Sequence, residues 1–308
     1  MSLVGVGVLR FGLIGAGRWG RNFVSTIEGV NGIELAWIAD PNPAIAPPCP
    51  LFDNRRAAFQ SEAVDGVIVA SPPHCHDDDI REAVARGVPV LVEKPLVLSG
   101  RTARDLSAFV EAHNGYVLVD HTHLFHPGYA KLKEMAAPLG SPLALQSGGG
   151  NWGPFREKTS VLWDWGPHDV ALCVDLMGKS PLTVKARCLE KKETPEGWGE
   201  NLAVELTFEP GVRATIEIGN LYRQKRRSLQ VDFGDQMFLL DDIAADKLVR
   251  RTGAGKFEPV AIADDPPLSC AVQAFAEAVR TNSKDIAPLK FAVQVVEVLE
   301  RCQTALIE

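Results

Sequence analysis

A glycine-rich turn near the amino terminus constrains the fold of this chain more than any other feature. Val8–Ile14 is a short apolar run typical of a buried strand, and Trp19–Ile27 follows the apolar spacing of a helix. Between these two elements lies the turn itself, whose residues are Gly15, Ala16, Gly17, Arg18, Trp19 and Gly20. The order strand, glycine turn, helix predicts backbone N–H groups and the positive end of a helix facing a phosphate.

Each glycine of this turn has a separate expected role. Gly15 permits the tight turn, Gly17 leaves room for a pyrophosphate, and Gly20 lets the helix pack closely on the strand. Asp40 ends the next apolar run, where a carboxylate accepts hydrogen bonds from both adenosine ribose hydroxyls and repels a 2′-phosphate. The six turn residues with Asp40 therefore predict a dinucleotide site that favours NAD over NADP. A glycine turn that binds no ligand is the alternative interpretation.

Strands and helices alternate through the first third of the chain. Apolar runs at 66–70, 88–92 and 116–119 predict further strands, and 77–86 has helical spacing. This alternation is typical of a doubly wound parallel sheet, so we expect an α/β Rossmann-type domain over residues 1–122. The proline-rich run 41–50 predicts an irregular loop, and we expect the usual helix after the second strand to be reduced or missing.

Short strand-like runs separated by turns dominate the second half, at 143–147, 182–189, 201–208, 212–219, 228–233 and 236–240. This pattern predicts an α+β domain with a large, mostly antiparallel open sheet over residues 123–308. Helices at 127–137 and 169–177 are expected to cover the buried face of the sheet, and helical patterns at 270–280 and 289–307 close the chain.

Composition excludes several classes of function. A formal net charge of −7 gives no basic footprint for nucleic acid, and no apolar stretch is long enough to cross a membrane. The first residues lack the pattern of a secretory signal, and six scattered cysteines without a CxxC pair are typical of reduced thiols. We therefore expect a cytoplasmic protein with no nucleic-acid or membrane partner.

Two short motifs follow expected strands, at the sheet edge where open α/β sheets bind ligands. The first runs from Ser71 and Pro72 to His76, and the second is Glu93-Lys94-Pro95. The polar residues at 74–79 superficially resemble metal ligands. Successive residues of one turn point in different directions, so we predict no metal site and assign the aspartates at 77–79 to a helix start.

The order of these motifs resembles one known family. The glycine turn, the aspartate, Ser-Pro-x-x-x-His, Glu-Lys-Pro and a later Asp-x-x-x-His resemble the glucose-fructose oxidoreductase, inositol dehydrogenase and rhizopine catabolism (Gfo/Idh/MocA) family. The resemblance covers nearly the whole chain and implies a catalytic set of Lys94, Asp164 and His168, with Lys94 contacting the reacting hydroxyl. It also implies an often cis Lys-Pro bond, a place for His76 near the nicotinamide, and a homodimer or homotetramer formed through the second sheet.

His168 has the chemistry of a general base in this setting. Gly166-Pro167 indicates a helix start and Gly178 a helix end, so we expect His168 in a first turn. There the helix dipole favours a neutral imidazole, and Asp164 would orient the ring and stabilise the imidazolium. Taken singly, Lys94 could instead be a solvated loop lysine, and the Asp164–His168 pair a local hydrogen bond.

The sequence signals for residues that contact the substrate are less specific than those for the catalytic set. His121 and His123 follow a strand and are expected to share one face, where they either contact a substrate hydroxyl or bridge the domains. Leu124 and Phe125 stand where many relatives carry an arginine, and a subgroup linked to nucleotide sugars looks closer. Three further residues are candidates. Arg156 could bind an anionic group of the substrate, and the rings of Trp163 and Trp165 could stack on a sugar. Core packing is the alternative for each tryptophan.

Together these observations predict an NAD-dependent oxidoreductase. It would transfer hydride between a secondary alcohol of a small sugar, cyclitol or nucleotide sugar and the nicotinamide. Two other classes remain open. One is a non-catalytic NAD-binding sensor, and the other is a hydrolase or epimerase that uses NAD in an internal redox cycle.

Overall fold

The structure, a computed structural model, describes residues 7–44, 46–156 and 159–307, without the side chain of residue 307. Residues 1–6, which bear on the expectation about a signal, lie outside this range. The chain forms two compact units. The first contains the residues up to Thr122 and Pro266–Val293, and the second contains His123–Asp265 and the residues from Gln294 onward. The sequence-based boundary after residue 122 had left Pro266–Val293 in the second domain.

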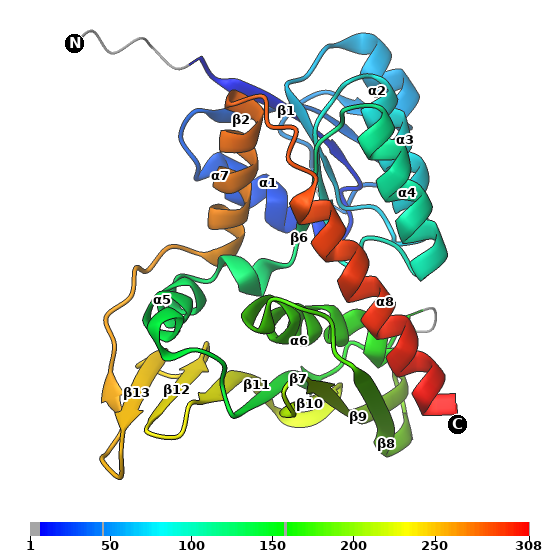
Figure 1. Ribbon diagram of the computed structural model, residues 1–308. Coiled ribbons are helices and arrows are strands. Elements are labelled where there is room, and N and C mark those ends of the chain that lie inside the picture. Colours follow the sequence, from blue (N-terminus) through cyan, green and yellow to red (C-terminus); the bar gives the residue numbers. More distant parts are fainter. Residues whose placement is uncertain (1–6, 45, 157–158, 308) are drawn as a thin grey trace, which may run out of the picture. The chain divides into compact units, whose positions relative to one another are not determined.

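The first unit contains a six-stranded parallel sheet in the order β3-β2-β1-β4-β5-β6. Helices cover both faces of this sheet, α1 and α7 on one side and α2, α3 and α4 on the other (Figure 1). This is the doubly wound arrangement that the sequence predicts. The elements are β1 (Leu9–Ile14), α1 (Gly20–Glu28), β2 (Ile33–Ala39), β3 (Leu51–Phe52), α2 (Arg55–Ser61), β4 (Gly66–Val69), α3 (His76–Ala85), β5 (Val90–Glu93), α4 (Gly100–Ala112), β6 (Val117–Asp120) and α7 (Pro267–Arg280).

Burial explains why these short strands form. All four residues of β4, β5 and β6 are buried, as expected for central parallel strands covered on both faces. Helix α7 comes from the far end of the sequence, and its Phe275 packs on Phe11 of β1 with ring centroids 5.1 Å apart. This aromatic contact explains why Pro266–Val293 groups with the first unit.

The proline-rich segment after Asp40 is irregular, as the sequence predicts. Its described residues up to Pro50 are irregular, and only a two-residue strand β3 and the seven-residue helix α2 follow. Asn54 caps α2 by accepting a hydrogen bond from the Ala57 backbone N–H at 3.0 Å.

The second unit is built on an eight-stranded sheet in the order β14-β13-β12-β11-β7-β10-β9-β8. Only the β7–β10 pair is parallel among the strand pairs of the described residues, so the sheet is mostly antiparallel, as expected. Its strands are β7 (Ala144–Trp152), β8 (Thr183–Thr194), β9 (Gly197–Phe208), β10 (Val212–Gly219), β11 (Leu221–Asp232), β12 (Gln236–Asp241), β13 (Leu248–Thr252) and β14 (Glu258–Pro259).

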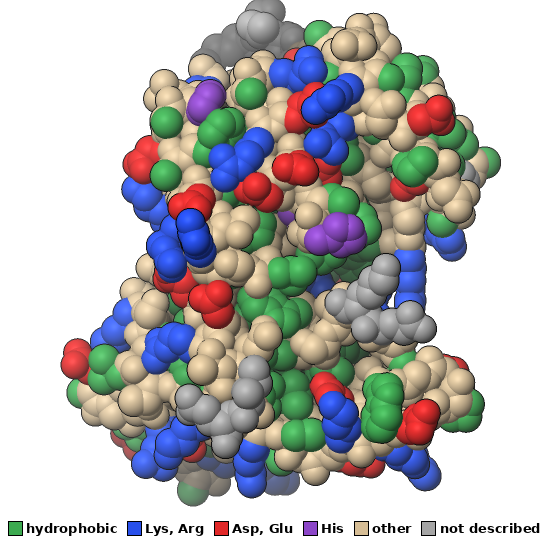
Figure 2. All heavy atoms as spheres, turned by 90° about the vertical axis from the view of Figure 1, so that its right-hand side faces the viewer, with side chains coloured by type: hydrophobic (Ala, Val, Ile, Leu, Met, Phe, Trp, Pro, Cys, Tyr) green, Lys and Arg blue, Asp and Glu red, His purple; other side chains and the backbone are tan. Residues whose placement is uncertain are grey.

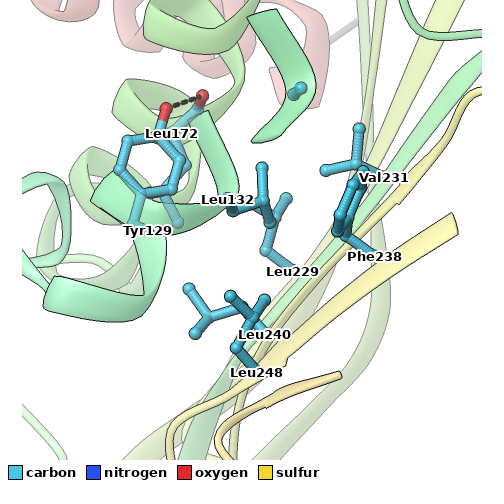
Figure 3. Close-up of a cluster of buried hydrophobic side chains, with 9 residues drawn as sticks. Tyr129, Leu132, Leu172, Leu229, Val231, Phe238, Leu240 and Leu248 are labelled. Atoms are coloured by element: carbon cyan, nitrogen blue, oxygen red, sulfur yellow. Dashed lines mark hydrogen bonds between the residues drawn. The ribbon is translucent and has the colours of Figure 1, made fainter. Parts of the chain in front are cut away.

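Helices α5 (Pro127–Ala136) and α6 (Val161–Met177) cover one face of this sheet. On β10, Ala214, Ile216 and Ile218 are buried, whereas Arg213 and Thr215 are exposed. Figure 3 shows the core beneath α5, where Tyr129 and Leu132 belong to one cluster with Phe238 of β12. The Tyr129 hydroxyl donates to the Leu172 carbonyl at 3.1 Å. Two 3₁₀ helices, η1 (Thr122–Phe125) and η2 (Ala137–Leu139), and α8 (Ala287–Ile307) complete the fold.

Helix α6 corrects one expectation. It begins at Val161, not at Gly166-Pro167, and Pro167 lies inside it. Val161, Leu162 and Trp163 are at most 6% exposed, so packing stabilises turns that the proline pattern argues against. His168 is therefore not in the first turn, and the dipole argument for its neutral form is wrong. Asp164 occupies the first turn instead. Gly178 ends the helix at φ 63°, as predicted.

Charged groups of both signs are interspersed on the face shown in Figure 2. Ion pairs join charged side chains of α2 and α3. Arg55 bonds Glu82 at 2.9 Å, and Arg81 bonds Asp77 at 2.9 Å within one helix. Within the part of the chain that the structure describes, the helices are too short or too polar to traverse a lipid bilayer.

Candidate functional site

The glycine turn has the geometry of a phosphate-binding loop. Gly15 has φ 91°, and a Cβ there would lie 2.6 Å from the Ser71 backbone nitrogen. A Cβ on Gly20 would overlap the carbonyl oxygen of Gly15, which shows how closely α1 approaches the end of β1. A Cβ on Gly17 would meet nothing within 4 Å. Gly17 therefore borders open space at the N-terminus of α1, where an anion is favoured.

Asp40 holds this turn in place. One carboxylate oxygen accepts from the Ala16 backbone N–H at 2.7 Å, and the other accepts from the Asn42 N–H at 2.7 Å. A carboxylate oxygen has a second lone pair, so these bonds leave acceptor capacity for a ribose hydroxyl. The proline-rich segment also contacts the turn, because the Ala44 N–H donates to the Ala16 carbonyl at 2.9 Å.

Ser71 follows β4 and is anchored by two buried side chains of α3. Its hydroxyl donates to Asp79, and its carbonyl accepts from His76 Nε2 at 2.8 Å. His76 is 1% exposed, and its Nδ1 faces the Pro95 carbonyl at 3.0 Å. Burial lowers the pKa of His76, although its carbonyl contacts oppose the shift. His76 thus ties the turn after β4 to the turn after β5.

Lys94 follows β5, and its peptide bond to Pro95 is cis, as the resemblance implies. Glu93 ends β5 and is paired in register with Asp120 at the end of β6. Asp120 is completely buried, and burial raises its pKa to about 7, with the Thr122 hydroxyl and the Lys94 ammonium opposing the shift. Lys94 therefore lies among acidic groups at the carboxyl edge of the parallel sheet.

His121 is buried in the same region of the first unit. Its exposure is 3%, its ring meets Phe291 edge-on at 5.8 Å, and burial followed by the Lys94 charge lowers its pKa to about 3. His121 is therefore neutral at physiological pH. The expectation that His121 and His123 share a strand face is wrong, because β6 ends at Asp120 and His123 belongs to η1.

In the second unit, Asp164 and His168 lie one helical turn apart on α6 and share a face of that helix. Asp164 is in the first turn, where the helix dipole stabilises its negative charge. The Arg156 Nε donates to the Asp164 carboxylate at 2.7 Å. The structure thus brings together Asp164, His168 and Arg156, three of the residues that the sequence singled out.

The two candidate tryptophans differ in their surroundings. Trp163 is 6% exposed, and its indole N–H donates to Gln303 of α8, so its ring serves core packing. Trp165 is half-buried and lies next to Gly149 of β7, where a Cβ would come within 3.7 Å of its ring. His123 stacks on His168, with ring centroids 4.3 Å apart and planes inclined by 24°.

Three residues that support the turns of the first unit were not among the sequence-predicted site residues. Arg55 of α2 pairs with Asp79 at 2.8 Å, and Asp79 accepts the Ser71 hydroxyl. Asp120 lies beside Glu93. The sequence signal for Asp120 is an acidic residue at the end of a buried strand, and Asp79 belongs to the aspartates assigned to a helix start. Arg55 has no signal beyond its charge.

Comparison with known proteins identifies the class of protein to which the chain belongs. Residues 9–121 match the family model described as "oxidoreductase family, NAD-binding Rossmann fold". Curated relatives include an inositol 2-dehydrogenase and the rhizopine catabolism protein MocA. The chain belongs to the Gfo/Idh/MocA oxidoreductase family.

Individual relatives differ in how much they share with the chain. Inositol 2-dehydrogenase 4 of Saccharopolyspora erythraea is 29% identical over 224 residues, which are 68% of this chain and 66% of that protein, just under two thirds of its length. A crystal structure from Magnetospirillum magnetotacticum MS-1, provisionally assigned as an oxidoreductase, is 37% identical, with a TM-score of 0.89 over 96% of this chain and 99% of that one.

The fold likeness extends to more distant structures. UDP-N-acetylglucosamine 3-dehydrogenase of Acidithiobacillus ferrooxidans has a TM-score of 0.84 at 22% identity, covering 97% of each chain. At this identity the likeness concerns the fold alone.

Proposed function

We propose that the chain is an NAD-dependent dehydrogenase that acts on a secondary alcohol of a sugar, cyclitol or nucleotide sugar. The observation that carries the proposal is the open space at Gly17, at the N-terminus of α1, in a chain that belongs to an oxidoreductase family. The names of two relatives, an inositol 2-dehydrogenase and a UDP-N-acetylglucosamine 3-dehydrogenase, support the substrate class.

The first unit would bind the dinucleotide. Backbone N–H groups of the glycine turn would bind the pyrophosphate at the positive end of α1. The negative charge of Asp40 would accept the ribose hydroxyls and repel a 2′-phosphate, which favours NAD over NADP. The turns after β4 and β5 would border the rest of the cofactor through Ser71, Pro72, His76, Glu93 and Lys94.

Bound NAD supplies a nicotinamide ring that accepts a hydride from the alcohol carbon. His168 would take the hydroxyl proton, and the Lys94 ammonium would stabilise the developing charge on that oxygen. Asp164 would stabilise the His168 imidazolium from the preceding turn of α6. Arg156, Trp165 and His121 are the proposed substrate-facing groups, whereas the packing of Trp163 in the core argues for a structural role. The sequence also offered His123 as a substrate contact, but its stack on His168 favours a different role.

The test measures turnover and NAD affinity separately. We expect Lys94→Ala and His168→Ala each to lower turnover about 100-fold or more, with NAD affinity within about twofold of wild type. Exposed residues of the same types supply the controls, Lys179→Ala and His113→Ala, which should leave both quantities unchanged. Wild-type turnover in both site variants would contradict the assignment.

A substrate panel separates the three classes of function. Stoichiometric NADH indicates a dehydrogenase, and product without net NADH indicates an internal redox cycle. NAD binding with neither outcome indicates a sensor. We further propose a cytoplasmic location and a homodimer or homotetramer formed through the open face of the second sheet.

A further inference from the structure

His123 stacks on His168 but does not belong to the proposed catalytic residues Lys94, Asp164 and His168. We propose that His123 is a positioning residue that fixes the ring of His168 and couples its protonation to a second imidazole. This inference rests on the proposed function in one respect, that His168 exchanges a proton with the substrate. The stack itself lies wholly within the second unit, between η1 and α6.

Stacking constrains how the two rings take up protons. Two positive charges about 4.3 Å apart repel each other even in water, so the rings do not both become charged in one step. A neutral imidazole face, in contrast, lies favourably against a cationic ring, as other aromatic faces do. The pair therefore accepts a first proton readily and a second only at lower pH, and His123 limits when His168 becomes charged.

The size of the cavity beside His123 favours a role in positioning His168 over contact with a substrate. His123 borders a cavity of about 20 Å³, room for one water molecule and too small for a sugar ring. Besides His123, its charged and titratable lining residues are the N-cap residue of α5, one residue each of α6 and β11, and the residue that follows β12: His126, Asp169, Arg227 and Asp242.

Most of the charged residues that line this cavity pair with one another or with a neighbouring side chain. Asp242 bonds Arg227 at 2.8 Å and His126 at 3.0 Å. Asp169 is 3% exposed and accepts from the Ser147 hydroxyl, and burial raises its pKa to about 6. Asp164 of α6, one turn before His168, pairs with Arg156, which precedes the helix. His123 thus stacks on His168 and also borders a small cavity whose charged groups are largely paired with one another.

Nuclear magnetic resonance of the full chain, with labelled histidines, tests the coupling without any assay of activity. We expect the two rings to titrate in two steps about one pH unit or more apart. His123→Phe and His168→Phe keep an aromatic ring in the stack and remove one titrating group. In each variant, the remaining histidine should take up its proton at a higher pH than the second, more acidic titration step of the wild type. Exposed His74 serves as the internal reference.

Kinetics then separates coupling from simple packing. His123→Phe should keep kcat within a few-fold of wild type at the optimum and displace the acidic limb of the pH profile. His123→Ala, which removes the stack, should lower kcat about tenfold with little change in KM.

Two results overturn the proposal. One is a pair of rings that titrate independently, at the same pH in wild type and variants. The other is a rise in KM for both His123 variants without any change of the pH profile, which would indicate substrate contact instead. Coupled titration in a chain without dehydrogenase turnover would support the pair and contradict the proposed function, so the two failures are distinguishable.

Discussion

Two glycine-to-alanine substitutions in the glycine turn should affect different properties, one the stability of the first unit and the other its affinity for NAD. In Gly20→Ala, the new methyl group would overlap the Gly15 carbonyl oxygen and lie 3.0 Å from its carbonyl carbon. Such overpacking against backbone costs about 1–3 kcal/mol, and the better helix propensity of alanine returns at most about 1 kcal/mol. We expect Gly20→Ala to lower the free energy of unfolding of the first unit.

Gly17→Ala should behave differently, because its methyl group would meet nothing within 4 Å. We expect the free energy of unfolding to stay within about 0.5 kcal/mol of wild type. The same methyl group would occupy the space proposed for the pyrophosphate, so NAD affinity should fall about tenfold or more.

Urea unfolding and calorimetric NAD titration measure the two quantities on the same samples. Gly29→Ala is the matched control at the end of α1, where a Cβ would make an ordinary 3.5 Å contact with the Thr26 carbonyl oxygen. Gly17→Ala that binds NAD like wild type would refute the assignment of this space to the pyrophosphate. Gly20→Ala with undiminished stability would refute the packing argument.

Two further predictions concern the second unit. Burial alone would raise the pKa of Asp242, but its hydrogen bond with His126 and the charge of Arg227 outweigh burial and hold this pKa well below its usual range. A depressed pKa contributes stability above about pH 4 that is lost as the pH falls further, so Asp242→Asn should cost about 2 kcal/mol at pH 7 and progressively less below pH 4. Urea midpoints across this pH range test it, with exposed Asp264→Asn as the control, and a loss that does not depend on pH would contradict the linkage. Light scattering of the 33.4 kDa chain should give the mass of a dimer or tetramer, and a monomer at micromolar concentration would rule out the proposed pairing of sheets.

Much of the first unit could be predicted from the sequence, because its strands and its glycine turn depend on requirements of neighbouring residues. Positive φ at Gly15 and the close approach of Gly20 are requirements that only glycine meets, so the glycines themselves mark the turn. Fully buried parallel strands appear in the sequence as short apolar runs, because helices cover both faces of the sheet. Local patterns also identified Asp40 at the end of β2 and the irregular segment after it. Helix α4 and the strands β13 and β14 were not anticipated.

The start of α6 shows what local patterns could not determine. Pro167 indicated a helix start, yet burial of Val161, Leu162 and Trp163 extends the helix six residues further back. Propensity is a preference of a few kcal/mol at most, and packing of three large side chains exceeds it. This extension moved His168 out of the first turn and placed Asp164 there.

Side-chain partners far apart in the sequence were decided by tertiary structure alone. The sequence determined which groups are present: the glycine turn, Asp40, Lys94, Asp164 and His168. Only the fold decided that the His76 ring lies between carbonyls of two turns, that Asp120 lies beside Glu93, and that His123 stacks on His168. Periodicity reports which face of an element is buried, but not which residue of another element it meets there.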